Sequence, residues 1–361
     1  MDIPIERLTE LVDGFQGKRV PEDLRRYVEE GEPAGVIVFR RNVADTEQVA
    51  ALVREVRSLW SSEGSAPLVA VDQEGGKVRR LRPPECPEFL DLPEARGVAA
   101  ARDVVLTRAL GELTARQLAA VGFNLDFSPV LDVDSNPANP VIGARSYGPD
   151  PAAVIAHALA FAQGLTDGGV IPCGKHFPGH GDTDLDSHHA LPSLPHQLDR
   201  LRRVELAPFK AAVDAGLPTM MSAHIVFEAL DADWPATLSP TVIPTLLREE
   251  LGFQGVIFSD DLEMRAIADH QPAAVIASQG LAASLDIFLV CHDLDRAREI
   301  RDALATAARH DPIAATRLEA SACRVRSLRR GAPDHALEPW RGVPGRGEAA
   351  ALLARLQGSL A

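Results

Sequence analysis

The sequence predicts an α/β protein, a single (β/α)8 TIM barrel with a short C-terminal extension. Its 361 residues are enough for one large barrel and some additional chain. Short β-branched or apolar runs alternate with longer stretches of helical periodicity, which is the rhythm of repeated βα units. Eight such runs occur, and no internal sequence repeat accompanies them. We therefore expect one barrel domain over residues 1–330 and an extension over residues 331–361.

The eight predicted strands follow one another along the whole barrel domain. The first is the most polar and the least regular of them. The runs are Leu8–Phe15, Ala34–Phe39, Leu68–Asp72, Phe123–Pro129, Val170–Phe177, Thr219–Ile225, Gly255–Asp260 and Asp286–Cys291.

The stretches between these runs are predicted to be helices, because apolar residues recur in them at spacings of three and four. Glycine commonly ends them, as expected at a helix C-terminus. The clearest examples span residues 46–60, 105–122, 151–169, 198–216 and 239–252. The tail after Arg330 is rich in glycine, proline and alanine and predicts a wrapping extension with one short helix.

Composition and charge narrow the possible partners. The formal net charge of −14 repels phosphate backbones and anionic lipids, so neither nucleic acid nor a membrane is expected as a partner. The four cysteines lie far apart without a CxxC pair, which fits a reducing compartment. The N-terminus resembles no signal peptide, and no apolar run reaches the roughly 18 residues of a membrane span. We expect a cytoplasmic monomer.

Polar residues gather where the predicted strands end. In a barrel of this kind the carboxyl ends of the strands carry the active site. A single such segment would be an ordinary turn or helix cap, but five at the same end favour a functional site. The segments are VDQEGGKVRR, PVLDVDSNPANPVIGARSYG, GKHFPGHGDTDLDSHHALP, SAHIVF and FSDDLEM.

The segment from Lys175 to His189 is dense enough in histidine and aspartate to raise the possibility of a metal site. The spacing of Asp182, Asp184 and Asp186 matches the first half of a calcium loop, but Ser187 and Ser193 stand where glycine and glutamate are needed. The i, i+4 pair His176 and His180 lies among proline and glycine, where no helix is expected. These two metal-binding patterns are incomplete, but the density of possible ligands keeps a metal-dependent hydrolase as a rival hypothesis.

General acid–base chemistry is another use for these residues. Asp186 and His188 are two apart, so in an extended segment the carboxylate could orient the imidazole while the imidazole transfers a proton. The adjacent Asp260 and Asp261, at the end of the seventh predicted strand, offer a carboxylate nucleophile. Spacing alone leaves open which of the two points inward.

The ordered blocks VDQEGGKVRR, NLDFSPVLDVD, NPVIGARSYG, KHFPGHGDTDLDSHHALP and GVIFSDDLEM closely resemble the β-N-acetylglucosaminidases of glycoside hydrolase family 3, the NagZ type. The resemblance covers about residues 8 to 330 and implies a (β/α)8 barrel. It implies Asp260 as nucleophile, His188 as general acid/base and Asp186 as its partner. It implies sugar contacts by Asp72, Arg80, Arg145, Lys175 and His176. Lys77 stands where the family usually has arginine, and the tail has no counterpart.

The activity implied by the resemblance is retaining removal of terminal β-linked N-acetylglucosamine, with no cofactor. The substrate would be a small carbohydrate or muropeptide, such as the GlcNAc-1,6-anhydro-muramyl peptides of peptidoglycan recycling. A histidine in place of the usual carboxylic acid would avoid repelling an anionic aglycone. A family 3 phosphorylase, with phosphate as the acceptor, and a sugar-binding barrel without turnover are two further hypotheses.

Overall fold

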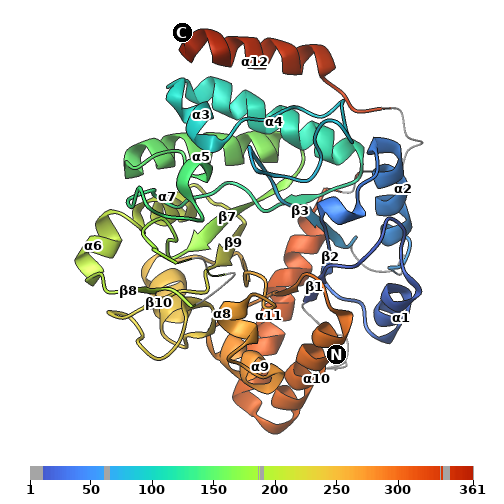
Figure 1. Ribbon diagram of the computed structural model, residues 1–361. Helices are drawn as coiled ribbons and strands as arrows, with labels where there is room; N and C mark the ends of the chain where they lie inside the picture. Colours follow the sequence, from blue (N-terminus) through green and yellow to red (C-terminus); the bar gives the residue numbers. More distant parts are fainter. Residues whose placement is uncertain are drawn as a thin grey trace.

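The computed structural model describes residues 11–60, 66–185, 187, 191–333, 335 and 342–360. Its centre is one curled, eight-stranded parallel sheet surrounded by helices (Figure 1). The strand order is β11 (Val256–Phe258), β9 (Thr219–Ser222), β7 (Ile171–Phe177), β6 (Leu125–Asp126), β3 (Leu68–Val71), β2 (Gly35–Val38), β1 (Leu11–Asp13) and β12 (Phe288–Val290). The α/β class is therefore confirmed.

The two strands at the ends of this order also meet. A single parallel bridge joins Phe258 of β11 to Ile287, directly before β12. The Ser259 amide donates to the Ile287 carbonyl at 2.8 Å, and the Leu262 amide donates to the Leu289 carbonyl at 2.9 Å. Each of the eight predicted runs contains one of these strands. Residues 8–10 of the first run lie outside the described residues.

The strands form here because their side chains are buried on both faces. Val69 and Val71 belong to a core cluster that also contains helix residues, whereas Leu68 and Ala70 belong to a second cluster made mostly of strand residues. This alternation places one face of the sheet against helices and the other against its own strands. The rings of Phe127 and Phe258 meet at 5.2 Å although two strands separate β6 from β11 in the sheet, so the second cluster fills the inside of the curl.

The helices lie outside the sheet. Those of the described chain are α1 (Glu22–Glu30), α2 (Thr46–Arg57), α3 (Ala95–Ala100), α4 (Val104–Ala120), α5 (Pro151–Asp167), α6 (Leu198–Arg203), α7 (Ala207–Asp214), α8 (Arg265–Ala268), α9 (Ala273–Ala282), α10 (Leu294–His310), α11 (Pro312–Gly331) and α12 (Arg346–Leu360). Aspartate side chains accept backbone N–H bonds at the start of α2, α4, α5, α10 and α11, which explains where these helices begin.

Shorter elements lie in the loops of the described residues. The 3₁₀ turns are η2 (Arg40–Asn42), η3 (Gly143–Arg145) and η4 (Ala236–Leu238). The segment η5 (Val242–Glu250) has π-type hydrogen bonding. The hairpin β4 (Gln73–Gly75) and β5 (Val78–Arg79) follows β3, and β8 (Ser193–Leu194) pairs with β10 (Val226–Phe227). These strand pairs follow the carboxyl ends of central strands, where the polar segments lie.

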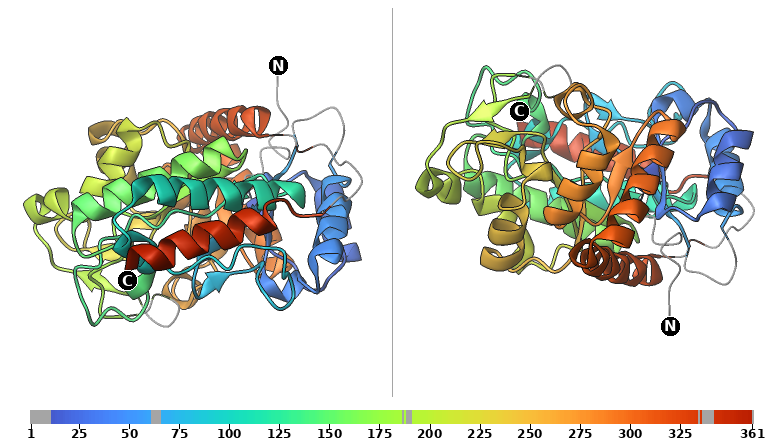
Figure 2. Two further views of the ribbon diagram at one scale, coloured as in Figure 1. Left: turned by 90° about the horizontal axis from the view of Figure 1, so that it is seen from above. Right: turned by 90° about the horizontal axis from the view of Figure 1, so that it is seen from below.

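Two helix predictions differ from the structure. The stretch 198–216 is divided into α6 and α7, because α6 ends before Val204 and Pro208 lies in the first turn of a new helix. The stretch 239–252 contains η5 instead of a regular α-helix. The short helix predicted in the tail is α12, which lies along α4 on the outside of the molecule (Figure 2). None of the described helices combines the length and apolar character needed to cross a membrane.

Candidate active site

Charged side chains converge at the carboxyl ends of the central strands. Asp72 directly follows β3, Lys175 belongs to β7, and Asp260 lies two residues beyond β11. The β4–β5 hairpin contributes Glu74, and Arg145 lies in η3. Because the strands of the central sheet are parallel, these residues from distant parts of the sequence meet at one end of the sheet.

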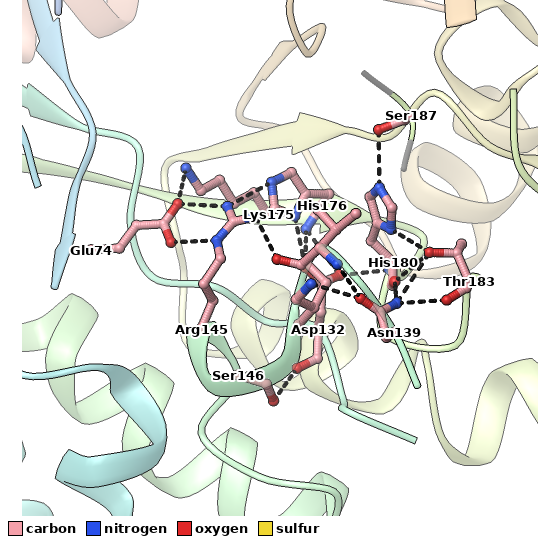
Figure 3. A network of polar contacts seen from close by, with 12 residues as sticks. Glu74, Asp132, Asn139, Arg145, Ser146, Lys175, His176, His180, Thr183 and Ser187 are labelled. Atoms are coloured by element: carbon pink, nitrogen blue, oxygen red, sulfur yellow. Dashed lines mark hydrogen bonds and ion pairs between the residues drawn. The ribbon is translucent and has the colours of Figure 1, made fainter. Parts of the chain in front are cut away.

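A chain of ion pairs joins most of the predicted sugar-contact residues. Figure 3 shows the part formed by Glu74, Arg145 and Lys175. Lys175 Nζ lies 2.8 Å from Asp72 Oδ1 and 2.6 Å from Glu74 Oε1. Arg80 Nη2 donates to Asp72 Oδ2 at 2.7 Å. Arg145 holds Glu74 with two hydrogen bonds of 2.8 Å. The structure therefore brings Asp72, Arg80, Arg145 and Lys175 together.

The neighbouring charges control the protonation of this cluster. Burial opposes ionisation, but Lys175 and Arg80 outweigh it and hold the pKa of Asp72 well below its usual range. Burial likewise opposes the charge on Glu74, yet Arg145 and Lys175 lower its pKa to about 2. For Lys175 the loss of solvation favours the neutral amine, while Asp72 and Glu74 raise the pKa above its ordinary value. All three groups are charged at neutral pH.

His176 lies beside this cluster and is oriented by a buried carboxylate. Its Nδ1 is 2.7 Å from Asp132 Oδ2, and its Nε2 is 3.5 Å from Arg145 Nη2. Asp132 is fully buried, and its Oδ1 accepts the His180 amide at 2.7 Å. Burial would raise the pKa of Asp132, but His176 and His180 lower it, so the carboxylate is ionised. Asp132 thus fixes both the ring and the backbone of this segment.

Asp260 and Asp261 point to different surroundings. Asp260 Oδ1 accepts the Asp261 amide at 2.8 Å. Burial raises the pKa of Asp260, but His176 and His224 outweigh that effect, and the pKa is lower than usual. Asp261 Oδ1 accepts the Glu263 amide, and its Oδ2 lies 3.5 Å from the half-exposed His292. The surroundings of Asp260, an ionised carboxylate facing the predicted sugar contacts, suit a nucleophile better.

The predicted proton-transfer pair, Asp186 and His188, lies outside the described residues. Ser187 between them is described. Its Oγ lies 3.1 Å from His180 Nε2, and its carbonyl accepts the amide of Ala266 in α8 at 3.4 Å. Burial, together with the neighbouring His176, lowers the pKa of His180 to about 4, so His180 is neutral near pH 7. Through these two contacts Ser187 is held between His180 and α8.

Two glycines allow the chain to enter this segment. Gly179 has φ of +135°, a conformation that other residues rarely adopt. A Cβ at Gly181 would lie 1.7 Å from the Val133 carbonyl oxygen. The backbone after β7 therefore approaches the β6 loop more closely than any side chain would permit.

The carboxylate of Asp182, considered above as a calcium ligand, has other partners. It pairs with His196 and with Arg200 Nη2 at 3.4 Å, and Arg200 also pairs with the buried Glu205 at 3.0 Å. Asp182, His196 and Glu205 lie close enough to hold a metal ion. However, the guanidinium already supplies positive charge to both carboxylates, which makes a cation less favourable there.

Three residues of this site were not assigned from the sequence. Glu74 is two positions from Asp72 in VDQEGG, a spacing that could have suggested a shared face. Asp132 follows β6 in an irregular loop, where no periodicity predicts its direction. His224 follows β9 in the segment SAHIVF, and its ring lies 2.9 Å from the Asp261 carbonyl. The only indication of its role in the sequence was its position just beyond a predicted strand.

A cavity of about 770 Å³ lies elsewhere, at the amino ends of the strands. Its walls are mostly apolar and include Ile171, Leu217, Pro218 and Val256. The ion-pair cluster and Asp260 are not among its lining residues. The cavity is thus separate from the polar end of the sheet, which carries the candidate chemistry.

A curled parallel sheet with a carboxylate and a buried ion-pair cluster at the carboxyl ends of its strands is typical of an enzyme that acts on a small polar molecule. Comparison with known proteins defines this class further. The family described as "Glycosyl hydrolase family 3 N terminal domain" matches residues 6–328. The chain belongs to glycoside hydrolase family 3.

The relatives found by sequence are β-hexosaminidases, and the solved structures include enzymes that act on N-acetylglucosamine. A β-hexosaminidase from Methylococcus capsulatus is 39% identical over 293 residues, which cover 80% of this chain and 84% of the relative. A family 3 β-N-acetylglucosaminidase from Paenibacillus sp. str. FPU-7 matches with TM-score 0.92 and 36% identity over 99% of this chain and 69% of that chain. NagZ from Neisseria gonorrhoeae matches with TM-score 0.80 and 32% identity, covering 96% and 98%. The family resemblance is therefore confirmed, and the chain is a glycoside hydrolase of the β-hexosaminidase group.

Proposed function

We propose that the protein is a retaining exo-β-N-acetylglucosaminidase that uses Asp260 as its nucleophile. The observation that carries this proposal is the position of Asp260, an ionised carboxylate at the end of β11 beside His176 and the Asp72–Lys175–Glu74 ion pairs. NagZ from Neisseria gonorrhoeae has been solved in complex with N-trifluoroacetyl-D-glucosamine, an N-acylated glucosamine. This similarity supports N-acetylglucosamine as the sugar.

In the proposed first step, Asp260 attacks the anomeric carbon while His188 protonates the leaving oxygen. The leaving group departs as an alcohol, and a covalent glycosyl–enzyme remains. In the second step His188 removes a proton from water, the water attacks the anomeric carbon, and the Asp260 carboxylate is released. Asp186 would orient His188 in both steps. The fixed ion pairs of Asp72, Arg80, Arg145 and Lys175 would hold the sugar hydroxyls, since they present donors and acceptors side by side.

The remaining features of the proposal concern architecture and setting. We interpret the curled sheet as a complete (β/α)8 barrel, because the Phe258–Ile287 bridge joins its end strands. Residues 1–330 would form the catalytic domain and 331–361 the extension. GlcNAc-1,6-anhydro-muramyl peptides of peptidoglycan recycling are the proposed substrates, and a cytoplasmic monomer is the proposed form. The similarity to NagZ from Neisseria gonorrhoeae is the basis for proposing these substrates.

The nucleophile is tested by trapping it. A fluorinated, slowly hydrolysed N-acetylglucosaminyl donor should label the wild-type protein at Asp260, and Asp260→Ala should lower kcat by several orders of magnitude. Peptide mapping by mass spectrometry reads out the labelled residue. Asp261→Asn is the matched control and should keep most of the activity. A label on Asp261 would overturn the assignment.

The reaction type is tested with chromogenic β-N-acetylglucosaminide and β-glucoside, each with and without phosphate. We expect the first to be cleaved preferentially, with free sugar of retained configuration as the product. Acceleration by phosphate with release of a sugar 1-phosphate would instead identify a phosphorylase.

The proton-transfer role of His188 has a separate signature. A nitrophenolate leaves without much protonation, whereas a sugar alcohol does not. His188→Ala should therefore retain more of its wild-type kcat/KM on a nitrophenyl glycoside than on a disaccharide. Equal losses on both substrates would contradict a role as general acid.

A further inference from the structure

His224 is a buried histidine beside the proposed nucleophile. It follows β9 by two residues and is completely shielded from solvent. Its Nδ1 lies 2.8 Å from Thr237 Oγ1 in η4, and its Nε2 lies 2.9 Å from the carbonyl oxygen of Asp261. The imidazole therefore bridges the loop after β9 and the turn after β11.

The protonation of one ring nitrogen follows from these partners. A carbonyl oxygen only accepts hydrogen bonds, so His224 Nε2 carries the hydrogen in the bond to Asp261. The Met264 amide donates to the same oxygen at 3.0 Å, and the Glu263 amide donates to Asp261 Oδ1 at 3.0 Å. Donors from both sides thus fix the orientation of residue Asp261.

The fixed residue in turn holds the nucleophile. The Asp261 amide donates to Asp260 Oδ1 at 2.8 Å. Rotation of the Asp261 backbone would misdirect this N–H and release the carboxylate. Thr237 holds the other side of the imidazole, and its own Oγ1 is fixed by contacts of 2.9 Å with the Ala223 carbonyl and with Ser222 Oγ.

We propose that His224 is a positioning residue for Asp260, acting through the backbone of Asp261. This inference rests on the proposed role of Asp260 as nucleophile. His224 would direct one carboxylate oxygen onto the Asp261 amide and leave the other for the anomeric carbon. It would also stabilise the ionised form, together with the other cationic or imidazole groups that face Asp260, namely His176, His180 and Lys175.

The simpler interpretation is that His224 only fills space. His157 of α5 is a matched control for His224. It is also buried, and its ring lies 2.7 Å from the hydroxyl of Thr107. Its ring stacks on Tyr147 at 6.1 Å between centroids. His157→Gln therefore makes the same chemical change in a buried environment on a helix outside the ion-pair cluster.

The test compares His224→Ala, His224→Gln and His157→Gln with the wild type. A displacement of the nucleophile by about 1 Å costs on the order of 100-fold in rate, so His224→Ala should lower kcat by roughly 10- to 100-fold. KM should change little, because His224 is not placed in contact with the sugar. Gln can offer an N–H near the position of Nε2, so His224→Gln should recover a large part of kcat. His157→Gln should keep kcat within about twofold, whatever its thermal stability.

Two further readouts separate positioning from packing. The acidic limb of kcat/KM should move to higher pH in His224→Ala, because Asp260 loses a stabilising neighbour, and should stay in place in His157→Gln. Labelling of Asp260 by the fluorinated donor should slow in parallel with kcat. If His224→Ala does not fold, His224→Gln carries the same tests, with a smaller expected loss in kcat and in labelling rate.

The outcomes distinguish this proposal from the proposed function. If wild-type Asp260 is labelled but His224→Ala and His224→Gln label at the wild-type rate, the positioning role is wrong and the nucleophile stands. Equal losses of kcat in His224→Gln and His157→Gln would also overturn the positioning role. If the wild type is labelled at another residue, the proposed function itself fails.

Discussion

Asp126, at the end of β6, is a buried residue whose carboxyl group has a strongly raised pKa. Its Oδ1 accepts the Gln73 amide at 2.9 Å, while its Oδ2 is buried without a hydrogen-bond partner among the described residues. Burial raises the pKa of Asp126 to about 8, against the lowering effects of Gln73 and Lys175. The carboxyl is therefore protonated at neutral pH, unlike that of nearby Asp72.

We expect Asp126→Asn to stabilise the protein, and more so as the pH rises. In the unfolded chain an aspartate ionises near pH 4, whereas folded Asp126 keeps its proton until about pH 8. Between these values the unfolded state binds fewer protons, so the free energy of unfolding of the wild type falls by up to about 1.4 kcal/mol per pH unit. Asparagine removes this loss and can still accept the Gln73 amide.

Urea unfolding at pH 5, 6.5 and 8 measures the effect. The difference between Asp126→Asn and wild type should grow with pH. Asp233→Asn, at an exposed position, controls for the removal of one negative charge. A difference that is constant or shrinks from pH 5 to pH 8 would show that Asp126 is ionised in the folded protein.

At the level of secondary structure, burial made the central strands predictable. Runs such as Ala34–Phe39 and Leu68–Asp72 are apolar because both faces of the sheet are covered, and the strands appear inside them. The break between α6 and α7 was less visible, although Pro208, without an amide hydrogen, marks the first turn of α7. The β4–β5 hairpin was not predicted, since its two short strands lack an apolar pattern.

The residues of the site can be divided in the same way, into those that the sequence pattern indicated and those that it did not. The pattern of strands placed Asp72, Lys175 and the Asp260–Asp261 pair at or near strand ends, but the choice of Asp260 over Asp261 came from the family resemblance. Asp132 and Glu74 could not be assigned, because their roles depend on contacts with His176 and Arg145 from distant segments. Periodicity describes the direction of a side chain within an element but not its partner across a loop.

The C-terminal helix α12 offers a prediction at this scale. Leu356 is 3% exposed and Ala349 is 8% exposed, and Arg116 of α4 pairs with Glu348 at 2.6 Å. Leu356→Ala should lower the free energy of unfolding by about 2 to 3 kcal/mol, the usual cost of truncating a buried leucine. Because α12 lies on the outside of α4 (Figure 2), KM and kcat should be unchanged.

Denaturant unfolding and steady-state kinetics test both parts. Leu360→Ala is the matched control, since Leu360 lies in the same helix and is 52% exposed. Equal destabilisation by the two substitutions, or a loss of activity in Leu356→Ala, would contradict the packing of α12 on α4.

At the scale of the whole molecule, the site depends on a single sheet. Asp72, Lys175 and Asp260 belong to segments that follow or lie in β3, β7 and β11, and no local unit of the chain contains all three. The ion pairs between Lys175 and the residues after β3 cross the inside of the curl. Assembly of the site and folding of the sheet should therefore be the same event.

Ligand binding should consequently stabilise the sheet as one unit. At a concentration of N-acetylglucosamine or an inhibitor about 100 times its Kd, the gain in unfolding free energy is about 2.7 kcal/mol. Differential scanning calorimetry should show the main transition moving to higher temperature as a whole. Glucose at equal concentration is the control and should move it less. A split into two transitions, only one of which shifts, would show that the site belongs to a smaller folding unit.

The pairing of β1 with both β2 and β12 has a consequence for synthesis on the ribosome. Leu11 of β1 lies opposite Phe288 of β12, so β1 is synthesised long before β12, the last strand of the described sheet to pair with it. Until residue 290 has emerged, the nascent sheet has two open parallel edges, and unpaired edges favour association with other chains. Translation pauses before β12 would lengthen this exposure, whereas pauses after it would not. The timing of the last strand, more than the stability of the finished sheet, would then set the yield of active protein in the cell.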